Sequence, residues 1–357
     1  MNLTTLIHLG IVLIIDLCHE LAGAHLVISR QDIPRRASCN VSKDRGGWEL
    51  KTESNLERVL EAGHFAVTAE LSPPQNADPQ VIKRKAGILK SYVDSFNVTD
   101  GQSAVVTMAS WAACLIGKEV GLDPIVQMTC RDRNRIALQM DILGVAALGI
   151  NNILCLSGDP ISSGSNPEAK PVLDFDSIQL VKTVKDLRDE KKFQNGEPIV
   201  GKEPRLFIGA VANPFVDPEN QVIQLAKKIK AGADFIQTQA VYNIEKFERW
   251  MGIVREEKLD NEVKILAGVA PLRSVAIARY LNTVLPNIEV PDEIIERLSR
   301  VPSREEVRRE GVRIAVETIG RLKEIEGVAG VHLMATEWEE SVPRICEDAG
   351  LYPRPSV

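Results

Sequence analysis

The sequence predicts an α/β protein with a (β/α)8 barrel and extra helices before the last strand. Short apolar runs recur along the chain, and each is followed by a polar turn and an amphipathic helical pattern. Eight such units over about 300 residues match the size of a (β/α)8 barrel. A doubly wound open sheet is the alternative, but the sequence contains no G-x-G-x-x-G fingerprint of that fold.

Eight runs are predicted to be strands buried on both faces, because they lack polar alternation. They are Phe65–Leu71, Phe96–Thr99, Ile125–Cys130, Ile153–Leu156, Leu206–Ala212, Phe235–Val241, Ile265–Ala270 and Val331–Ala335. The fourth run stops at Ser157-Gly158-Asp159-Pro160, which places a carboxylate where α/β folds carry their chemistry. An aspartate that only starts a turn is the other interpretation of Asp159.

Helical spacing appears between the predicted strands. Apolar residues occur at i, i+4, i+7 and i+11 in three segments: Ile82–Val93, Ile136–Ala147 and Val222–Ala233. Asp78-Pro79 and Asp217-Pro218 are typical helix starts, and Ser54/Glu57, Ser303/Glu306 and Thr336/Glu339 have the spacing of capping boxes. The extra helices are predicted at Val275–Leu285, Asp292–Arg300 and Arg304–Ile325, the last with a solvated or subunit-facing surface.

Composition excludes several classes of function. The net charge is −6 and no basic face is evident, which argues against a nucleic-acid binder. The 6 cysteines are scattered without a C-x-x-C pair, which disfavours a zinc or iron–sulfur site and suits the cytoplasm. His64 and His332 lack the spacing of a metal pair and are interpreted as structural, so no metal site is predicted.

The N-terminal segment does not follow the repeating pattern. Leu3–Leu17 is apolar but too short to span a bilayer, and no Lys or Arg precedes Arg30. Residues 1–50 are therefore interpreted as a poorly structured extension or a mis-assigned start, with a signal peptide as the alternative. Residues 51–357 are predicted to form one catalytic barrel domain without a membrane segment.

Polar residues gather at the predicted carboxyl ends of six strands, as they would around a lined pocket. They include Glu70, Thr99, Gln127, Asp159, Asn213 and Gln239. Burial raises the pKa of a carboxyl group, so a glutamate within an apolar run is suited to deliver a proton. An aspartate at an open strand end stays ionised and accepts hydrogen bonds, which separates the roles of Glu70 and Asp159.

Five motifs in this order resemble the methylenetetrahydrofolate reductase family. They are FAVTAELSPP (65–74), NVTDG (97–101), QMTCRD (127–132), LSGDP (156–160) and AGADFIQTQ (231–239). The resemblance runs from about residue 54 through GVHLMATEWEESVPRICEDAGL (330–351). The sequence is most similar to the reductases of anaerobic bacteria that build methyl groups in one-carbon metabolism. Such methyl groups supply methionine biosynthesis.

The resemblance implies a flavin-containing barrel that reduces 5,10-methylenetetrahydrofolate to 5-methyltetrahydrofolate. It implies that Glu70 is the general acid, that Asp159 lies beside the flavin and also binds the pterin, and that Gln239 contacts the folate. The implied cofactor is FAD, with FMN as an alternative. The resemblance places these residues around it: Thr99, Gln127, Leu156, Ser157, Gly158, Asp159, Asn213, Asp217, Gln224, Lys228 and Gln239.

The sequence also departs from the family pattern. Related sequences often carry His at position 127, Tyr at 213, His at 217, Arg at 157 and a stacking Phe at 275, where this chain has Val275. The electron donor is therefore expected to be NAD(P)H or a partner protein. The chain is predicted to be a homo-oligomer or the folate-side flavin subunit of a complex with an iron–sulfur or zinc partner. A pterin-binding barrel without redox activity is the third hypothesis.

Overall fold

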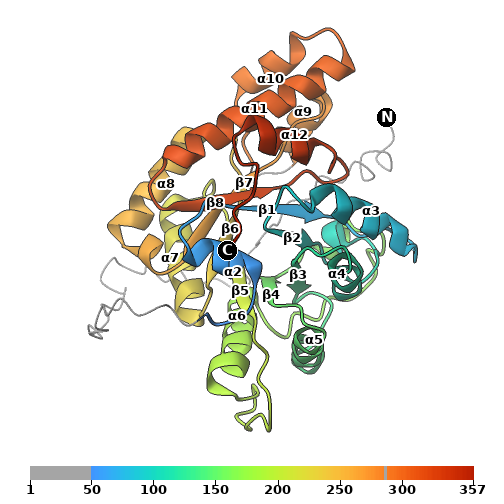
Figure 1. Cartoon of the computed structure of the whole chain (residues 1–357), viewed down its shortest axis with the longest axis vertical. Coiled ribbons are helices and arrows are strands. Elements are labelled where there is room, and N and C mark those ends of the chain that lie inside the picture. The colour runs from blue at the N-terminus through green and yellow to red at the C-terminus, as the bar shows by residue number, and fades with distance from the viewer. Residues whose placement is uncertain (1–49, 285–287) are drawn as a thin grey trace.

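The computed structural model describes residues 50–284 and 288–357, and eight parallel strands in it form a closed barrel (Figure 1). Neighbours in the barrel are also neighbours in sequence, from β1 to β8, and β8 pairs with β1. The predicted (β/α)8 fold is confirmed, and the doubly wound alternative is wrong. The predictions for the N-terminal extension lie outside the described residues, apart from Leu50.

Each observed strand overlaps its predicted run. The strands are β1 (Ala66–Leu71), β2 (Ser95–Val98), β3 (Pro124–Thr129), β4 (Asn152–Leu156), β5 (Phe207–Ala212), β6 (Phe235–Ala240), β7 (Lys264–Val269) and β8 (Val328–Leu333). The largest difference is at β8, which begins at Val328, whereas the apolar run suggested Val331. The Val-Ala-Gly start of β8 is too weakly apolar to mark a strand by composition.

Helices surround the barrel and fill the interval before β8. They are α2 (Asn55–Glu61), α3 (Pro79–Leu89), α4 (Ser110–Lys118), α5 (Arg135–Ala147), α6 (Ser177–Lys185), α7 (Pro218–Ala231), α8 (Ile244–Glu256), α9 (Val275–Val284), α10 (Asp292–Ser299), α11 (Arg304–Glu324) and α12 (Ser341–Asp348). The three extra helices are thus confirmed as α9, α10 and α11, which lie together at one end of the molecule in Figure 1.

Most predicted helix caps are present, and one is wrong. The side chains of Ser54, Asp78, Asp217 and Ser303 each accept a backbone hydrogen bond in the first turn of α2, α3, α7 and α11. Thr336 caps no helix: its hydroxyl bonds a side chain inside the barrel, and α12 begins only at Ser341. A capping box is a local sequence pattern, whereas the Thr336 hydroxyl forms a tertiary hydrogen bond with Glu70 instead of capping a helix.

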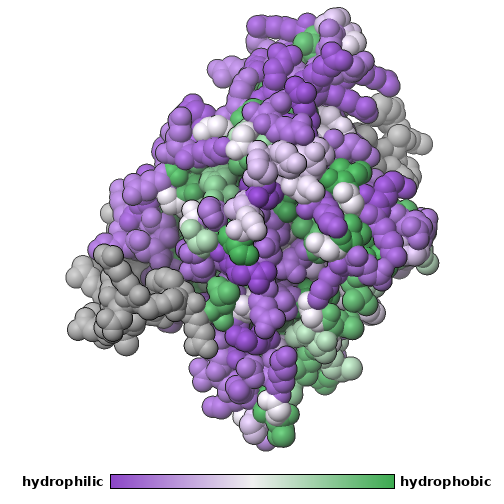
Figure 2. Space-filling model, in the orientation of Figure 1, coloured by the Kyte–Doolittle hydropathy of each residue, from purple (hydrophilic) through white to green (hydrophobic). Residues whose placement is uncertain are grey.

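Helix α5 turns a different face to the barrel from the one that its spacing suggested. Leu138, Ile142 and Val145 are its buried residues, whereas Ile136 and Met140 are 65% and 66% exposed. The helix is apolar around most of its circumference, so periodicity alone does not identify the packed stripe. Hydrophobic surface is visible in Figure 2 over the region where Figure 1 places α4 and α5.

The amino-terminal end of the barrel is closed by helix α2. Its side chains Leu56, Val59 and Leu60 belong to one cluster with inward-facing residues of the strands. Those strand residues are Ala66, Ile125, Leu154, Leu156, Phe207, Val211, Phe235 and Leu266. The alternate strand residues, such as Val67 and Ala69, belong instead to the core between sheet and helices. This alternation identifies the inward positions of each strand.

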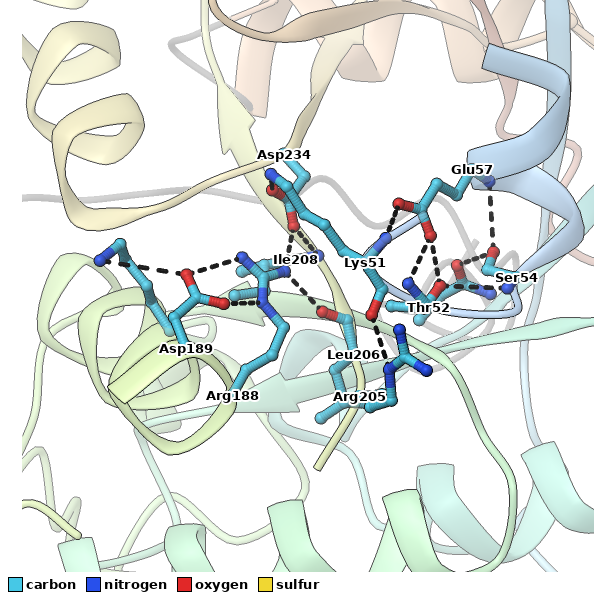
Figure 3. A network of polar contacts seen from close by, with 12 residues as sticks. Lys51, Thr52, Ser54, Glu57, Arg188, Asp189, Arg205, Leu206, Ile208 and Asp234 are labelled. Atoms are coloured by element: carbon cyan, nitrogen blue, oxygen red, sulfur yellow. Dashed lines mark hydrogen bonds and ion pairs between the residues drawn. The ribbon is translucent and has the colours of Figure 1, made fainter. Parts of the chain in front are cut away.

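A buried ionic network anchors the segment before α2 to the base of β5 and β6 (Figure 3). Asp234, at the start of β6, pairs with Arg188 at 2.5 Å and with Lys51, and it also accepts from the backbone of Ile208. The Arg188 guanidinium further donates to the carbonyl of Leu206 at 2.8 Å. The network therefore fixes the closed end of the barrel.

Two further features bear on the class of protein. Within residues 50–284 and 288–357, no helix is both long enough and apolar enough to cross a bilayer. In the same part of the chain, no group of three or more His, Cys, Asp or Glu side chains is arranged to hold a metal ion.

Candidate active site

A polar layer crosses the barrel above its apolar base. Asn97 and Gln237 exchange two amide hydrogen bonds, of 2.7 and 3.0 Å, across the interior. Gln237 also donates to the Thr68 hydroxyl, which in turn lies 2.9 Å from Nδ1 of His332. These four side chains come from β1, β2, β6 and β8 and are fully buried. Their mutual hydrogen bonds satisfy groups that would otherwise be costly to bury.

Glu70 lies directly above this layer, on the inward face of β1, and is 1% exposed. Its Oε1 accepts from the Gln102 amide at 2.9 Å and from the Thr336 hydroxyl at 2.8 Å. Its Oε2 accepts no hydrogen bond from any residue in the described ranges and lies 3.8 Å from Nε2 of His332. Glu70 is therefore held through Oε1, while Oε2 faces Nε2 of His332.

The loop after β2 connects Glu70 with Asp159, which follows β4. Gln102 donates to Glu70, and the backbone N–H of the next residue, Ser103, donates to Oδ2 of Asp159 at 2.7 Å. Two consecutive residues thus hold the two predicted carboxylates at one rim of the barrel. Asp159 is half-buried, whereas Glu70 is fully buried.

This loop is itself attached to the end of β3. Asp100 accepts from the backbone and hydroxyl of Thr129, both at 2.9 Å, and from two guanidinium nitrogens of Arg133. Burial would lower the pKa of Arg133, but its hydrogen bonds and ion pairing with Asp100 outweigh that and raise the pKa. The position of Gln102 and Ser103 thus depends on contacts between β2 and β3.

Several predicted cofactor residues line the same rim. Thr99 follows β2, Gln127 is on the inward face of β3, and Leu156 ends β4 before the half-buried Ser157 and Gly158. The Gln127 amide nitrogen is buried and has no hydrogen-bond partner among the described residues. A buried amide without an acceptor is a costly feature that a ligand with a carbonyl or ring nitrogen would satisfy.

Four of the remaining predicted cofactor residues follow β5. The side chain of Asn213 accepts from the backbone of Phe215 at 3.1 Å, and Asp217 caps α7. Gln224 is half-buried on α7, and the Lys228 ammonium donates to the carbonyl of Val211 at 2.8 Å, beneath the end of β5. The structure places these four residues on one connection of the barrel, next to the β4 loop in strand order.

A concave, mainly apolar surface lies at the ends of β6, β7 and β8. It adjoins Glu70, because Thr336 belongs both to this surface and to the hydrogen bonds of Glu70. Gln239, on the inward face of β6, lies one residue before Ala240 in its lining. The lining residues include Tyr242, Leu272, Arg273, Ile277, Met334 and Trp338. An apolar wall beside a few fixed polar groups suits an aromatic ligand.

Lys85 supports the loop that carries Thr336. Its ammonium lies 2.7 Å from Glu337, 2.9 Å from Glu339 and 3.3 Å from the carbonyl of Ser72. Burial raises the pKa of Glu339, against the opposing effect of Lys85. Burial would lower the pKa of Lys85, but the two carboxylates outweigh it and raise that pKa. The loops after β1 and β8 are thereby joined through Lys85.

Some residues of the site carry no recognisable sequence signal. Gln102 and Thr336 hold Glu70, yet neither ends a predicted strand, and the Thr336 spacing indicated a helix cap. His332 was interpreted as structural, and the structure places its Nε2 3.8 Å from Glu70. The alternation of Thr68 and Glu70, or Asn97 and Thr99, along single strands is the one pattern that could have revealed the inward polar layer.

Comparison with known proteins gives a consistent result. The family model described as methylenetetrahydrofolate reductase matches residues 55–350. A relative from Schizosaccharomyces pombe, "Methylenetetrahydrofolate reductase 2", is 26% identical over 260 residues, covering 71% of this chain and 39% of the relative. The "5,10-methylenetetrahydrofolate reductase" of Pectobacterium carotovorum subsp. carotovorum is 25% identical over 303 residues, covering 82% of this chain and 92% of the relative.

The chain spans less than half the length of several relatives, including a Caenorhabditis elegans protein of which it covers 45%. Among solved structures, an uncharacterized protein from Clostridium thermocellum has a TM-score of 0.56 at 14% identity, covering 84% of this chain and all of that one. Its title states that it binds two copies of 5-methyl-5,6,7,8-tetrahydrofolic acid. At this identity the likeness supports the fold alone.

Proposed function

The chain belongs to the methylenetetrahydrofolate reductase family, and we propose that it reduces 5,10-methylenetetrahydrofolate to 5-methyltetrahydrofolate with hydride from a bound reduced flavin. The observation that carries this proposal is the linked pair of carboxylates, in which Gln102 and Ser103 hold Glu70 and Asp159 at one rim. The two have different surroundings, since Glu70 is fully buried and Asp159 is half-buried. Such a difference in surroundings suits two carboxyl groups with separate chemical roles.

The rim fits a flavin ring. The buried Gln127 amide, which lacks an acceptor among the described residues, would donate to a carbonyl or nitrogen of the ring. Thr99, Leu156, Ser157, Gly158 and Asp159 would surround the ring at the ends of β2 and β4. The part of the flavin beyond the ring would be lined by residues of the connection after β5, namely Asn213, Asp217, Gln224 and Lys228. The bound form would be FAD or FMN. When bound and reduced, the flavin would be the hydride donor, and the hydride carries two electrons.

The chain's own residues would position the folate and move a proton. Glu70 would hold a proton on Oε2, because Oε1 already accepts two hydrogen bonds. It would deliver that proton to a nitrogen of the bridged folate and so open the ring to the reactive iminium. Asp159 and Gln239 would bind the pterin, and the apolar wall near Met334 and Trp338 would exclude water.

Flavin content and its reoxidation test the function. The purified chain is expected to bind FAD or FMN, to bleach on reduction with dithionite, and to recover its absorbance when 5,10-methylenetetrahydrofolate is added without oxygen. Product analysis should then show 5-methyltetrahydrofolate. A preparation that takes up neither flavin, or whose reduced flavin is not reoxidised by the folate, would contradict the proposal.

Replacement of Thr336 by valine should slow folate reduction about tenfold, because it removes one of two hydrogen bonds that hold the Glu70 carboxyl group. Flavin binding should be unchanged. Stopped-flow reoxidation of the reduced protein by folate measures the step. The matched control is Thr318→Val, since Thr318 donates to Ile314 within α11 and should leave this rate unaltered. Equal rates for Thr336→Val and wild type would show that the Thr336 hydrogen bond does not contribute to folate reduction.

Val275 favours a second candidate function, that of a folate-side flavin subunit that receives electrons from an iron–sulfur or zinc partner. Val275 begins α9 and packs against an apolar cluster, and its own side chain is aliphatic, so it offers no aromatic face to a nicotinamide. Oxidation of NADH or NADPH by the isolated chain with a dye acceptor separates the two: rapid oxidation supports the stand-alone enzyme. Folate reduction only with an added low-potential donor supports the subunit.

A further inference from the structure

Arg131, which lies in the motif QMTCRD just after β3, connects three loops at the rim. It is 5% exposed. Its guanidinium donates to the carbonyl of Gly101 at 3.0 Å, in the loop after β2, and to the carbonyl of Asp159 at 3.2 Å, in the loop after β4. The neighbouring Asp132 holds the same guanidinium through two hydrogen bonds, of 2.9 and 2.7 Å. One side chain therefore joins the ends of β2, β3 and β4.

Two glycines leave space for this side chain. Gly101 has φ +57°, and a Cβ there would lie 2.6 Å from the Arg131 guanidinium. Gly158 has φ +94°, and a Cβ there would lie 2.9 Å from Cβ of Arg131. A side chain at either position would therefore strain the backbone and displace part of Arg131. The motifs NVTDG, QMTCRD and LSGDP each contribute one part of a single arrangement around Arg131.

The arrangement controls both carboxylates. The loop that Arg131 ties down at Gly101 continues into Gln102 and Ser103, which donate to Glu70 and Asp159. Asp159 is then held twice, through its carboxylate by Ser103 and through its carbonyl by Arg131. Related sequences often carry an arginine at position 157, where this chain has Ser157, and the guanidinium that reaches this loop comes from Arg131.

We propose that Arg131 is a positioning residue that holds the loop 101–103 against the loop 157–159, so that Asp159 stays oriented toward the substrates. The proposal rests on the proposed function for its kinetic consequence, whereas its structural part is independent of activity. Lysine cannot replace the arginine, because one ammonium group does not reproduce a planar fork that reaches two carbonyls and a carboxylate together.

Amide hydrogen exchange tests the structural part on the full chain without substrate. Arg131→Met and Arg131→Lys should raise exchange of the peptide containing Ser103 about tenfold, because its N–H loses a fixed partner. Gly101→Ala, which displaces the guanidinium from the other side, should do the same. Arg135→Lys is the matched control, since Arg135 pairs with Asp174 at an exposed site. Unchanged exchange in all three variants would overturn the proposal.

A double-mutant cycle tests the kinetic part. Arg131→Met should slow flavin reoxidation by folate about tenfold in the wild-type background and by a smaller factor in an Asp159→Asn background, since part of its effect acts through Asp159. A residue needed only for folding would give the same factor in both backgrounds, and that result would overturn the proposal. If the wild-type protein itself shows no reoxidation by folate, the proposed function has failed, and the exchange experiment still decides the role of Arg131.

Discussion

Replacement of Glu70 by glutamine is expected to lower folate reduction by about 10²–10⁴-fold, the range of a lost general acid. The substitution keeps the side-chain shape and an oxygen that accepts from Gln102 and Thr336, so the site should stay folded. It removes the proton that Oε2 would carry. Reduction of the bound flavin does not need that proton, so its rate should change little. Stopped-flow measurement of the two half-reactions separates these effects.

Glu57→Gln is the matched control for this experiment. Glu57 is also a buried glutamate, but it lies at the opposite end of the barrel, where it accepts from the backbone of Lys51 and Thr52. Its replacement should lower stability without altering either half-reaction of the folded protein. If Glu70→Gln reduced folate as fast as wild type, Glu70 would not be the acid. If both half-reactions fell together, its role would lie in flavin binding or folding.

Replacement of Asp234 by asparagine is expected to destabilise the fold by about 3 kcal/mol, the lower part of the range for breaking a buried ion pair. The change places an amide group beside the Arg188 guanidinium, the Ile208 N–H and Lys51, all of which are donors. The Arg188 side chain is 5% exposed and would lose one of its two carboxylate partners. Asp189 remains as the other, so we expect the lower end of the range. Urea unfolding measures the change.

The exposed pair of Arg344 and Asp348 provides the comparison. Both side chains are open to solvent on α12, and Asp348→Asn should change stability by less than about 0.5 kcal/mol. The folate half-reaction should be unchanged in Asp234→Asn under native conditions, because the network lies at the closed end of the barrel (Figure 3). Equal effects of the two substitutions would mean that the buried network contributes no more than a surface ion pair.

The regular parts of the fold could be predicted from sequence because they depend on local patterns. Doubly buried strands need continuous apolar runs, and helices between them need apolar stripes and caps, as at Asp78 and Ser303. The packed face of α5 could not be predicted, because that helix is apolar on more than one side. Thr336 likewise matched a cap pattern, and only the closed barrel shows that it faces Glu70.

By itself, the sequence determined that this chain forms a (β/α)8 barrel, and its ordered motifs indicated which family it belongs to. It also identified the strand ends that carry Glu70 and Asp159, because residues at the carboxyl ends of parallel strands share one rim. Only the tertiary structure decided how the two are joined, through Gln102, Ser103 and the arginine that holds their loop. These hydrogen bonds connect loops that follow different strands and are far apart in sequence. They therefore produce no periodic pattern that could be recognised in the sequence.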